Sequence, residues 1–540
     1  MSAPTAHRDT FVRDNLPPIE AQPVFLFDRP ELHYPDRLNA AHLLDRVIEA
    51  GRGSADAIVC GDLRWSYAEL NATAARIAHV LTRDPTFATG ARVLLHGPNA
   101  ARTIAAWFGI VRAGGVVVAT MPMLRAGELA KVVEKARISH AIADASLAEA
   151  VEGARDATGW LTRIHYFGEG GALERDAAAM PDAFPAVETA ADDPVLIAFT
   201  SGTTGVPKGC IHYHRDVHVM VDTFSRHILK PEPSEIFCGT PPIAFTFGLG
   251  GVAIFPLAAG ACAALPSKPG FDGLEEAIER HGVTTLFTAP TGYRALLKTH
   301  PKGPRGLRKC VSAGEALPAA TSQAWFEATG VRIIDGIGAT EMIHIFISAS
   351  GNDVRPGATG KPVPGFIAEI QDDAGAALPP GEIGRLAVRG PTGCRYLADA
   401  RQADYVKRGW NMTGDMYRVD EDGYFWFVSR ADDMIVSSGY NIGAPEVENA
   451  LLQHADVAEA AVIGVPDAER GQICKAYVVL KTGEGSDAKA QELQAFVKGV
   501  IAPYKYPRAV EFVEALPKTQ TGKLQRFRLR EGALPEGRPA

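Results

Sequence analysis

The segment Phe199-Thr-Ser-Gly-Thr-Thr-Gly-Val-Pro-Lys-Gly209 decides the fold class, and the apolar run Val195 to Phe199 leads directly into it. This order predicts a strand that ends in a polar, glycine-rich loop. Glycines let backbone amides approach phosphate oxygens, the Ser and Thr hydroxyls can donate hydrogen bonds, and Lys208 adds positive charge. Because the Gly-Lys-Ser/Thr of a Walker loop is absent, a P-loop NTPase is not indicated. We predict a triphosphate-binding loop of another kind.

Short apolar runs alternate with helical patterns on both sides of this loop. Such alternation predicts an α/β fold, in which a large N-terminal domain of parallel or mixed sheets is flanked by helices. The runs expected to form strands are Val93 to His96, Gly115 to Ala119, Val195 to Thr200, Thr284 to Thr288, Lys309 to Ser312 and Arg332 to Asp335. Ligands of such sheets bind at the carboxyl ends of the strands, so the loops after these runs should carry the chemistry.

A second organisation begins near Arg430. Pro445 followed by Glu446 is a helix start signal, and helical and strand patterns then alternate over short distances. The expected elements are strands over Val457 to Val465, Ala476 to Leu480 and Arg508 to Val513, and a helix over Leu493 to Ile501. We predict a small α+β domain of about a hundred residues, a common domain size.

The composition limits the kind of protein. The chain has 540 residues, 46% of them apolar and 22% charged, which is typical of a globular protein with several domains. The net charge of -8 and the scattered Lys and Arg residues argue against a nucleic-acid partner. The seven cysteines form no CxxC pair, and Met1 to Asn15 lacks the apolar core of a signal peptide. We therefore expect reduced thiols and a cytoplasmic protein.

The stretch Pro241 to Ser267 contains no charged residue and is long enough to cross a bilayer. It is interrupted by prolines and glycines, which would leave backbone polar groups unsatisfied in lipid. We interpret it as tight turns in a protein core, and we expect no association with a membrane.

The segment at Phe199 to Gly209 resembles the phosphate loop of the adenylate-forming superfamily, which includes acyl-CoA synthetases, luciferases and the adenylation domains of peptide synthetases. Five further motifs resemble those of the family and follow in its order, so that the resemblance spans nearly the whole chain. They are Ser312-Ala-Gly-Glu-Ala316, Asp335-Gly-Ile-Gly-Ala-Thr-Glu341, Thr413-Gly-Asp415, Arg430-Ala-Asp-Asp433 and Lys518-Thr-Gln-Thr-Gly-Lys523.

The resemblance implies an ATP site and an order of domains. The residues it assigns to ATP are Thr200, Ser201, Gly202, Thr203, Gly205, Lys208, Gly314, Glu315, Ala316, Asp335, Gly336, Ile337, Thr340, Asp415 and Arg430. It gives catalytic roles to Thr204, Glu341 and Lys523, with Glu341 also the Mg²⁺ ligand. It implies an N-terminal domain over residues 1–431, a hinge at 432–433 that pivots at Asp432, and a mobile C-terminal domain over 434–540. Gly439 and Tyr440 are implied to contact coenzyme A.

The substrate class follows from loops next to these motifs. Pro241 to Gly248 offers Phe245 and Phe247, and Glu341 to Phe346 offers His344 and Ile345. Apolar walls with few polar groups suit a small flat acid. These strings, together with His212 to Asp216, resemble benzoate and 2-aminobenzoate CoA ligases. By this resemblance the residues expected to bind the acid are Tyr213, Phe245, Phe247, Ala313, Gly338, His344 and Ile345.

The sequence therefore predicts an ATP-dependent aryl-CoA ligase, with 2-aminobenzoate as the first expected substrate and benzoate as the second. The expected partners are ATP, Mg²⁺, coenzyme A and a small aromatic carboxylate, in a monomer or homodimer. Two alternatives stay open at this point: an enzyme that loads the acid onto a carrier protein, and a scaffold that binds nucleotide without catalysis. His212, His214 and His218 could suggest zinc, but no further ligand cluster accompanies them.

Four positions depart from the family pattern. Phe245 stands where the family often has His, Ile337 where it has an aromatic residue, Ser429 where it has Gly, and Asn441 where it has Arg. The first two departures imply a reshaped acid pocket and a nonaromatic cover for adenine. The last puts in doubt a basic contact from that position to the nucleotide phosphates.

Overall fold

A six-stranded sheet ends at the predicted phosphate loop. The computed structural model describes residues 3–200, 207–268, 270–437, 440–467, 469–518 and 524–532, and it orders this sheet β6-β5-β3-β4-β7-β8. The strands are β3 (Arg92–His96), β4 (Val116–Thr120), β5 (His140–Asp144), β6 (Arg163–Phe167), β7 (Pro194–Thr200) and β8 (Lys208–Tyr213). All pairings are parallel except that β8 returns antiparallel on β7, with Thr200 opposite Lys208. The phosphate loop therefore connects two paired strands.

A nine-stranded sheet carries the other predicted loops, in the order β15-β14-β13-β12-β11-β9-β10-β1-β2. Its strands are β1 (Asp56–Cys60), β2 (Leu63–Ser66), β9 (Ile236–Gly239), β10 (Cys262–Ala264), β11 (Thr285–Thr288), β12 (Lys309–Ser312), β13 (Ile333–Gly338), β14 (Ile345–Ser348) and β15 (Lys361–Pro362). The middle strands are parallel, and the outer pairings are antiparallel. The predicted strand over Arg332 to Asp335 is thus longer, and its end leads to Glu341.

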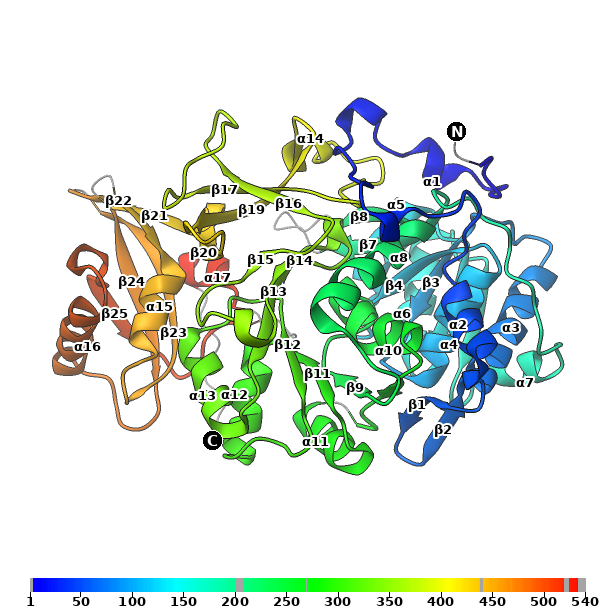
Figure 1. Ribbon diagram of the computed structural model, residues 1–540, viewed down its shortest axis with the longest axis horizontal. Helices are drawn as coiled ribbons and strands as arrows, with labels where there is room; N and C mark the ends of the chain where they lie inside the picture. The colour runs from blue at the N-terminus through cyan, green and yellow to red at the C-terminus, as the bar shows by residue number, and fades with distance from the viewer. Residues whose placement is uncertain are drawn as a thin grey trace.

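Helices α3 (Tyr67–Arg83) and α4 (Ala101–Arg112) pack between these two sheets, where the largest apolar core lies (Figure 1). Ser66 caps α3, since its hydroxyl accepts from the Glu69 amide while the Glu69 carboxylate accepts from the Ser66 amide. On the other face of the six-stranded sheet, α5 (Ala126–Ala136) and α6 (Ala148–Thr158) cover a second core. The other helices of the large domain include α8 (His214–Met220), α11 (Gly270–His281), α12 (Pro290–Thr299) and α13 (Ala319–Thr329).

A third sheet is antiparallel and joins the beginning of the chain to residues near 400. It contains β16 (Ile367–Gln371), β17 (Gly384–Arg389), β18 (Val406–Lys407), β19 (Trp410–Val419) and β20 (Phe425–Arg430). Phe25 pairs with Gly390, the Leu26 amide donates to the Gly390 carbonyl at 2.9 Å, and the Gln402 amide donates to the Ala21 carbonyl at 2.9 Å. The N-terminal segment, dark blue in Figure 1, is thereby fixed beside this sheet.

A fourth sheet forms the C-terminal part, at one end of the molecule (Figure 1). Its strands are β21 (Met434–Ser437), β22 (Tyr440–Gly443), β23 (Val457–Asp467), β24 (Gly471–Leu480) and β25 (Ala509–Phe512). Helices α15 (Ala444–Leu451) and α16 (Asp487–Val500) share a separate apolar core with it, and α17 (Arg526–Arg530) follows. The predicted α/β fold with a small α+β C-terminal part is confirmed.

The uncharged stretch Pro241 to Ser267 folds into short pieces rather than one long helix. They are α9 (Thr246–Gly248), η6 (Leu249–Ile254), α10 (Phe255–Ala258) and β10. Its apolar side chains, Val252 and Phe255 among them, are buried in the largest core. Within the described residues, no helix combines the length and the apolar character that a membrane crossing requires.

Candidate active site

Three side chains with hydrogen-bonding or charged groups meet beside the phosphate loop. Lys208, the first residue of β8, donates from Nζ to the Tyr396 hydroxyl at 3.0 Å and lies 3.9 Å from Glu341 Oε1. The Tyr396 hydroxyl donates to the same Glu341 oxygen. The Thr200 hydroxyl, at the end of β7, is buried and has no hydrogen-bond partner among the described residues. The cluster therefore offers a cation, a carboxylate and a phenol hydroxyl, and Thr200 lies opposite Lys208 on the paired strand.

The Glu341 carboxylate is buried, and its burial raises its pKa. Hydrogen bonding from Tyr396 and the charge of Lys208 act in the opposite direction. A carboxylate of this kind gains from a further positive charge, because a nearby cation favours its ionised form. Carboxylate oxygens are ligands that Mg²⁺ prefers, and Lys208 and Tyr396 offset only part of the effect of burial on this carboxylate. The site therefore fits a Mg²⁺ ion.

The backbone next to Glu341 is strained. Glu341 lies in the short helix η7 (Thr340–Met342), which ends at Ile343 with φ 61° and ψ -35°. A β-branched residue at positive φ costs about 1–3 kcal/mol and persists only where neighbouring contacts impose it. The segment that carries Thr340 and Glu341 is therefore held in place by its surroundings.

The predicted adenine side lies at the ends of two parallel strands. Ser312 of β12 pairs with Asp335 of β13, and the Ala313 to Ala316 loop follows β12. Gly314 has φ 91°, a conformation that glycine adopts without strain. Asp335 Oδ1 is buried without a hydrogen-bond partner in the described part of the chain, and burial raises the Asp335 pKa to about 8.

The predicted ribose side is a cross-strand pair. Asp415 of β19 lies opposite Arg430 of β20, and the Arg430 guanidinium donates to Asp415 Oδ1 at 2.7 Å. Burial raises the pKa of Asp415, and Arg430 opposes this shift. The pairing joins the two residues predicted to contact the ribose, and their contact with a nucleotide stays a prediction.

A cluster of rings lies on the other side of η7. His344 is buried, with its ring centroid 4.6 Å from Phe255, 5.2 Å from Phe224 and 5.9 Å from Phe247. Burial lowers the His344 pKa to about 3, so the imidazole is neutral at working pH. Neither ring nitrogen makes a hydrogen bond of normal distance and angle among the described residues, and only the Phe247 backbone opposes the lowering of the pKa. An apolar wall with one neutral polar group results.

The other residues predicted to bind the acid lie in different settings. Ala313 and Ile345 belong to the same apolar core as His344's neighbours, and Gly338 pairs with Ile345. Phe245 is half-buried and precedes α9. Tyr213 instead packs in the core under α5 and α6, with its ring 4.1 Å from the Arg395 guanidinium. Its contact with an acid therefore stays a prediction.

The sequence pattern did not point to Phe224, Phe255 or Tyr396. Phe224 and Phe255 are single apolar residues of helical segments, and nothing in their sequence setting distinguishes them from core residues. Tyr396 has no motif of its own. The pairing of the Gly209 and Ile211 backbones with Leu397 and Arg395 brings it beside Glu341.

The C-terminal part presents an exposed aromatic pair. Tyr440 is 56% exposed and its ring lies 4.7 Å from that of Tyr504. Asp432 is exposed, and the neighbouring Asp433 pairs with Arg530 of α17. The predicted site residues that lie outside the described residues are Ser201, Gly202, Thr203, Thr204, Gly205, Gly439 and Lys523.

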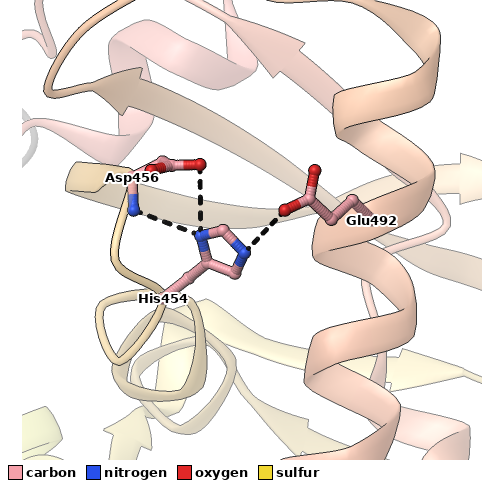
Figure 2. Close-up of side chains that lie close together, drawn as sticks. All are labelled: His454, Asp456 and Glu492. Carbon is pink, nitrogen blue, oxygen red and sulfur yellow. Dashed lines mark hydrogen bonds and ion pairs between the residues drawn. The ribbon is translucent and has the colours of Figure 1, made fainter.

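One group of possible metal ligands occurs elsewhere in the described residues. His454, Asp456 and Glu492 bring one ligand atom each within 4.8 Å of one another (Figure 2). Lys489 already pairs with Asp456 at 2.8 Å and with Glu492 at 2.7 Å. The Lys489 ammonium already neutralises both carboxylates, so no metal ion is needed there. The group is best explained as a set of ion pairs that links α16 to the loop before β23.

Comparison with known proteins agrees with this geometry. A family model described as AMP-binding enzyme matches residues 45–396, and one described as AMP-binding enzyme C-terminal domain matches residues 446–523. The chain belongs to the AMP-binding enzyme family. The resemblance inferred from the six motifs is thereby confirmed.

Relatives of this AMP-binding enzyme include ligases of aromatic acids. A benzoate–CoA ligase of Thauera aromatica is 35% identical over 514 residues, which cover 93% of this chain and 97% of the relative. A 4-hydroxybenzoate–CoA/benzoate–CoA ligase of Rhodopseudomonas palustris is 34% identical, with 92% and 94% covered. A solved anthranilate CoA ligase in complex with anthranoyl-AMP superimposes with a TM-score of 0.89 at 35% identity, covering 94% of this chain and 99% of that one.

Proposed function

We propose that this AMP-binding enzyme is an aryl-CoA ligase. It would join a small aromatic carboxylate to ATP, release pyrophosphate, and then transfer the acyl group from the adenylate to coenzyme A. The observation that carries the proposal is the segment Thr340 to Ile345, which directs Glu341 toward Lys208 and Tyr396 and His344 toward three phenylalanine rings. One short segment thus adjoins a charged cluster and a cluster of aromatic rings.

The first step brings two anions together. The acid's carboxylate attacks the α-phosphate in line with the departing pyrophosphate, so positive charge must be placed before reaction. Lys208 supplies such a charge from β8, and Thr340 lies beside Glu341 in η7. Mg²⁺ held by Glu341 would neutralise charge on the pyrophosphate. By family resemblance, Thr204 would contact the triphosphate and Lys523 would bridge the carboxylate and the α-phosphate.

The nucleoside would lie between the two strand ends and the β19–β20 pair. Asp415 can accept from both ribose hydroxyls while Arg430 donates to the same sugar, since each oxygen of a carboxylate accepts more than one hydrogen bond. Gly336 and Ile337 would cover adenine, with Asp335 and the Gly314 to Ala316 loop at its edge. An aliphatic cover at Ile337 replaces the aromatic residue common in the family.

We propose 2-aminobenzoate as the preferred acid and benzoate as the second. A neutral imidazole can accept a hydrogen bond at one ring nitrogen, and among the described residues no donor reaches His344 within normal hydrogen-bond geometry. A ring amine would supply the missing donor, whereas benzoate would not. The similarity to an anthranilate ligase supports this choice, and benzoate ligases of nearly equal identity support the second.

The second step requires a different arrangement. Lys523 would leave the α-phosphate and the CoA thiol would take a path along Gly439 and Tyr440, so we propose rotation of residues 434–540 about Asp432. Arg530 of α17 lies within the proposed mobile part, so its ion pair with Asp433 joins that part to the hinge and would change in the rotation.

Exchange of labelled pyrophosphate into ATP tests the proposal. Exchange should depend on added 2-aminobenzoate or benzoate and be weak with a twelve-carbon fatty acid, whose chain exceeds the ring-lined pocket. Equal use of the fatty acid would contradict the pocket. Exchange with no acid would favour a nucleotide-binding scaffold, and adenylate formation without transfer to CoA would favour loading of a carrier protein.

A further inference from the structure

His212 contacts the segment that carries Glu341. Side chains of a strand alternate between its two faces, so Lys208 and His212 of β8 lie on the same face. Lys208 approaches Glu341 at 3.9 Å, and His212 Nε2 lies 2.8 Å from the Thr340 carbonyl oxygen. A carbonyl only accepts, so Nε2 carries the proton of this hydrogen bond. The strand therefore reaches η7 at two points.

The second ring nitrogen of His212 faces a buried ion pair. Its Nδ1 lies 3.7 Å from Asp216 Oδ2, which accepts from the Arg395 guanidinium at 2.8 Å and from the Tyr213 amide at 2.9 Å. His212, Asp216 and Arg395 are completely buried. A buried charge pair persists only with well-placed partners, and Asp216 has two in Arg395 and the Tyr213 amide. His212 packs against this pair, and its one hydrogen bond among the described residues goes from Nε2 to Thr340.

Tyr396, the residue after Arg395, also contacts η7, because its hydroxyl donates to the Glu341 carboxylate. The Thr340 carbonyl accepts from His212 and also from the amide of Ile343 at 3.1 Å, the residue with φ 61°. Strained backbone persists where surrounding contacts determine it. His212 supplies one of those contacts, at the carbonyl that closes the strained turn.

We propose that His212 is a positioning residue for adenylation: its hydrogen bond to Thr340 fixes η7 so that the Glu341 carboxylate points at the phosphate cluster. The inference rests on the adenylating site proposed above. His212 contacts neither substrate nor the reacting atoms, and it acts through Thr340 and Glu341. Hydrogen bonds of His212 and His214 also explain these histidines without zinc. His212 Nε2 donates to the Thr340 carbonyl, and His214 Nδ1 accepts from the Ala40 amide at 3.0 Å.

Two substitutions of His212 differ in reach and test the proposal. The amide nitrogen of His212→Gln can stand where Nε2 stands, whereas that of His212→Asn reaches only the place of Nδ1. We expect His212→Asn to slow acid-dependent pyrophosphate exchange about 30-fold and to raise the half-saturating Mg²⁺ concentration about tenfold, the scale for losing a residue that orients a metal ligand. His212→Gln should stay within about threefold of wild type on both measures, a barrier change of about 0.7 kcal/mol.

His218→Asn is the matched control. His218 is a buried histidine of the adjacent helix α8 and has no hydrogen bond to η7 among the described residues. Its exchange rate and Mg²⁺ dependence should equal those of wild type, and thermal melting of all three variants reports whether they fold.

The outcomes separate the two proposals. If His212→Asn matches wild type, or if His212→Gln is as impaired as His212→Asn, the positioning role is wrong. Titration of ATP binding against Mg²⁺ by calorimetry needs no acid, and the same order of variants is expected there. If none of the tested acids supported pyrophosphate exchange by the wild type, the aryl-CoA ligase proposal would fail. The ATP-binding titration would still decide the role of His212.

Discussion

Glu341 and His344 lie three residues apart and occupy opposite kinds of surroundings. Glu341 is buried against Lys208 and Tyr396, which both approach its carboxylate. His344 is buried among phenylalanine rings, and no donor in the described residues reaches its ring nitrogens within normal hydrogen-bond geometry. The Glu341 carboxylate already has a cation and a hydrogen-bond donor beside it. The accepting nitrogen of the His344 ring has no donor among the described residues.

The difference suggests a division of work within one short segment. Groups around Glu341 should determine how fast any acid is activated, because the phosphate chemistry is the same for all acids. Groups around His344 should determine which acid is activated, because unpaired polar atoms in a closed pocket discriminate between partners. Substitutions on the two sides should therefore have separable effects.

The largest effect is expected from Glu341→Gln. Loss of the charge that would hold Mg²⁺ should slow pyrophosphate exchange about 100- to 1,000-fold, the scale for one preorganised charge-stabilising group. The loss should be equal for 2-aminobenzoate and benzoate. Glu235→Gln is the control, since Glu235 is another buried carboxylate and pairs with Lys309 at 2.5 Å. Unequal losses for the two acids would contradict the proposal that the groups around Glu341 determine the rate and not the choice of acid.

Asp335→Asn tests a buried carboxylate without a cation. Burial raises the folded-state pKa of Asp335 from 3.8 to about 8, so the fold favours the protonated form and stability is lost as pH rises toward 8. Between pH 6 and pH 8 wild type should lose roughly 2 kcal/mol that the variant keeps. The Tm of the variant should therefore gain about 2 °C on wild type over this interval. A constant Tm difference would mean that Asp335 is ionised throughout.

Tyr396→Phe should have a smaller effect on the charged side. It removes the hydroxyl between Lys208 and Glu341, and we expect about a tenfold slower exchange with either acid, the worth of one hydrogen bond to a charged group. Tyr405→Phe is a matched control, because the buried Tyr405 hydroxyl has no hydrogen-bond partner in the described residues and its ring lies 5.9 Å from Tyr396. Equal losses in both variants would assign the effect to packing.

His344→Leu should give the smallest change and the most selective one. We expect the ratio of kcat/KM for 2-aminobenzoate over benzoate to fall about fivefold, because one hydrogen-bond acceptor is lost, about 1 kcal/mol. Exchange with benzoate should stay near the wild-type rate. If both acids slow equally and the ratio is unchanged, His344 only fills space.

Elements with a local pattern could be predicted from the sequence. Strand β12 has the predicted bounds Lys309–Ser312, and β7 begins only one residue before the predicted Val195. Short apolar segments bounded by charged, proline or small polar residues carry that information. The cluster at Glu341 was half predictable, since Lys208 and Glu341 lie in motifs.

The contacts that hold the cluster could not be predicted in this way. Tyr396 is 55 residues from Glu341, and Arg395 is 179 residues from Asp216. Neither residue has a spacing or a flanking pattern that sets it apart. Their placement follows from the pairing of residues 209–211 with 395–397, a product of tertiary structure.

The attachment of the N-terminal segment has a consequence for biosynthesis. Gln402 binds the Ala21 carbonyl across 381 residues, and Phe25 pairs with Gly390 and covers the Arg395 guanidinium at 4.4 Å. At ribosomal speeds of 5–20 residues per second, the segment waits roughly 20 to 80 s for its partner sheet to emerge. Until then, Phe25 and its neighbours stay accessible to chaperones, and the buried pair behind His212 stays incomplete.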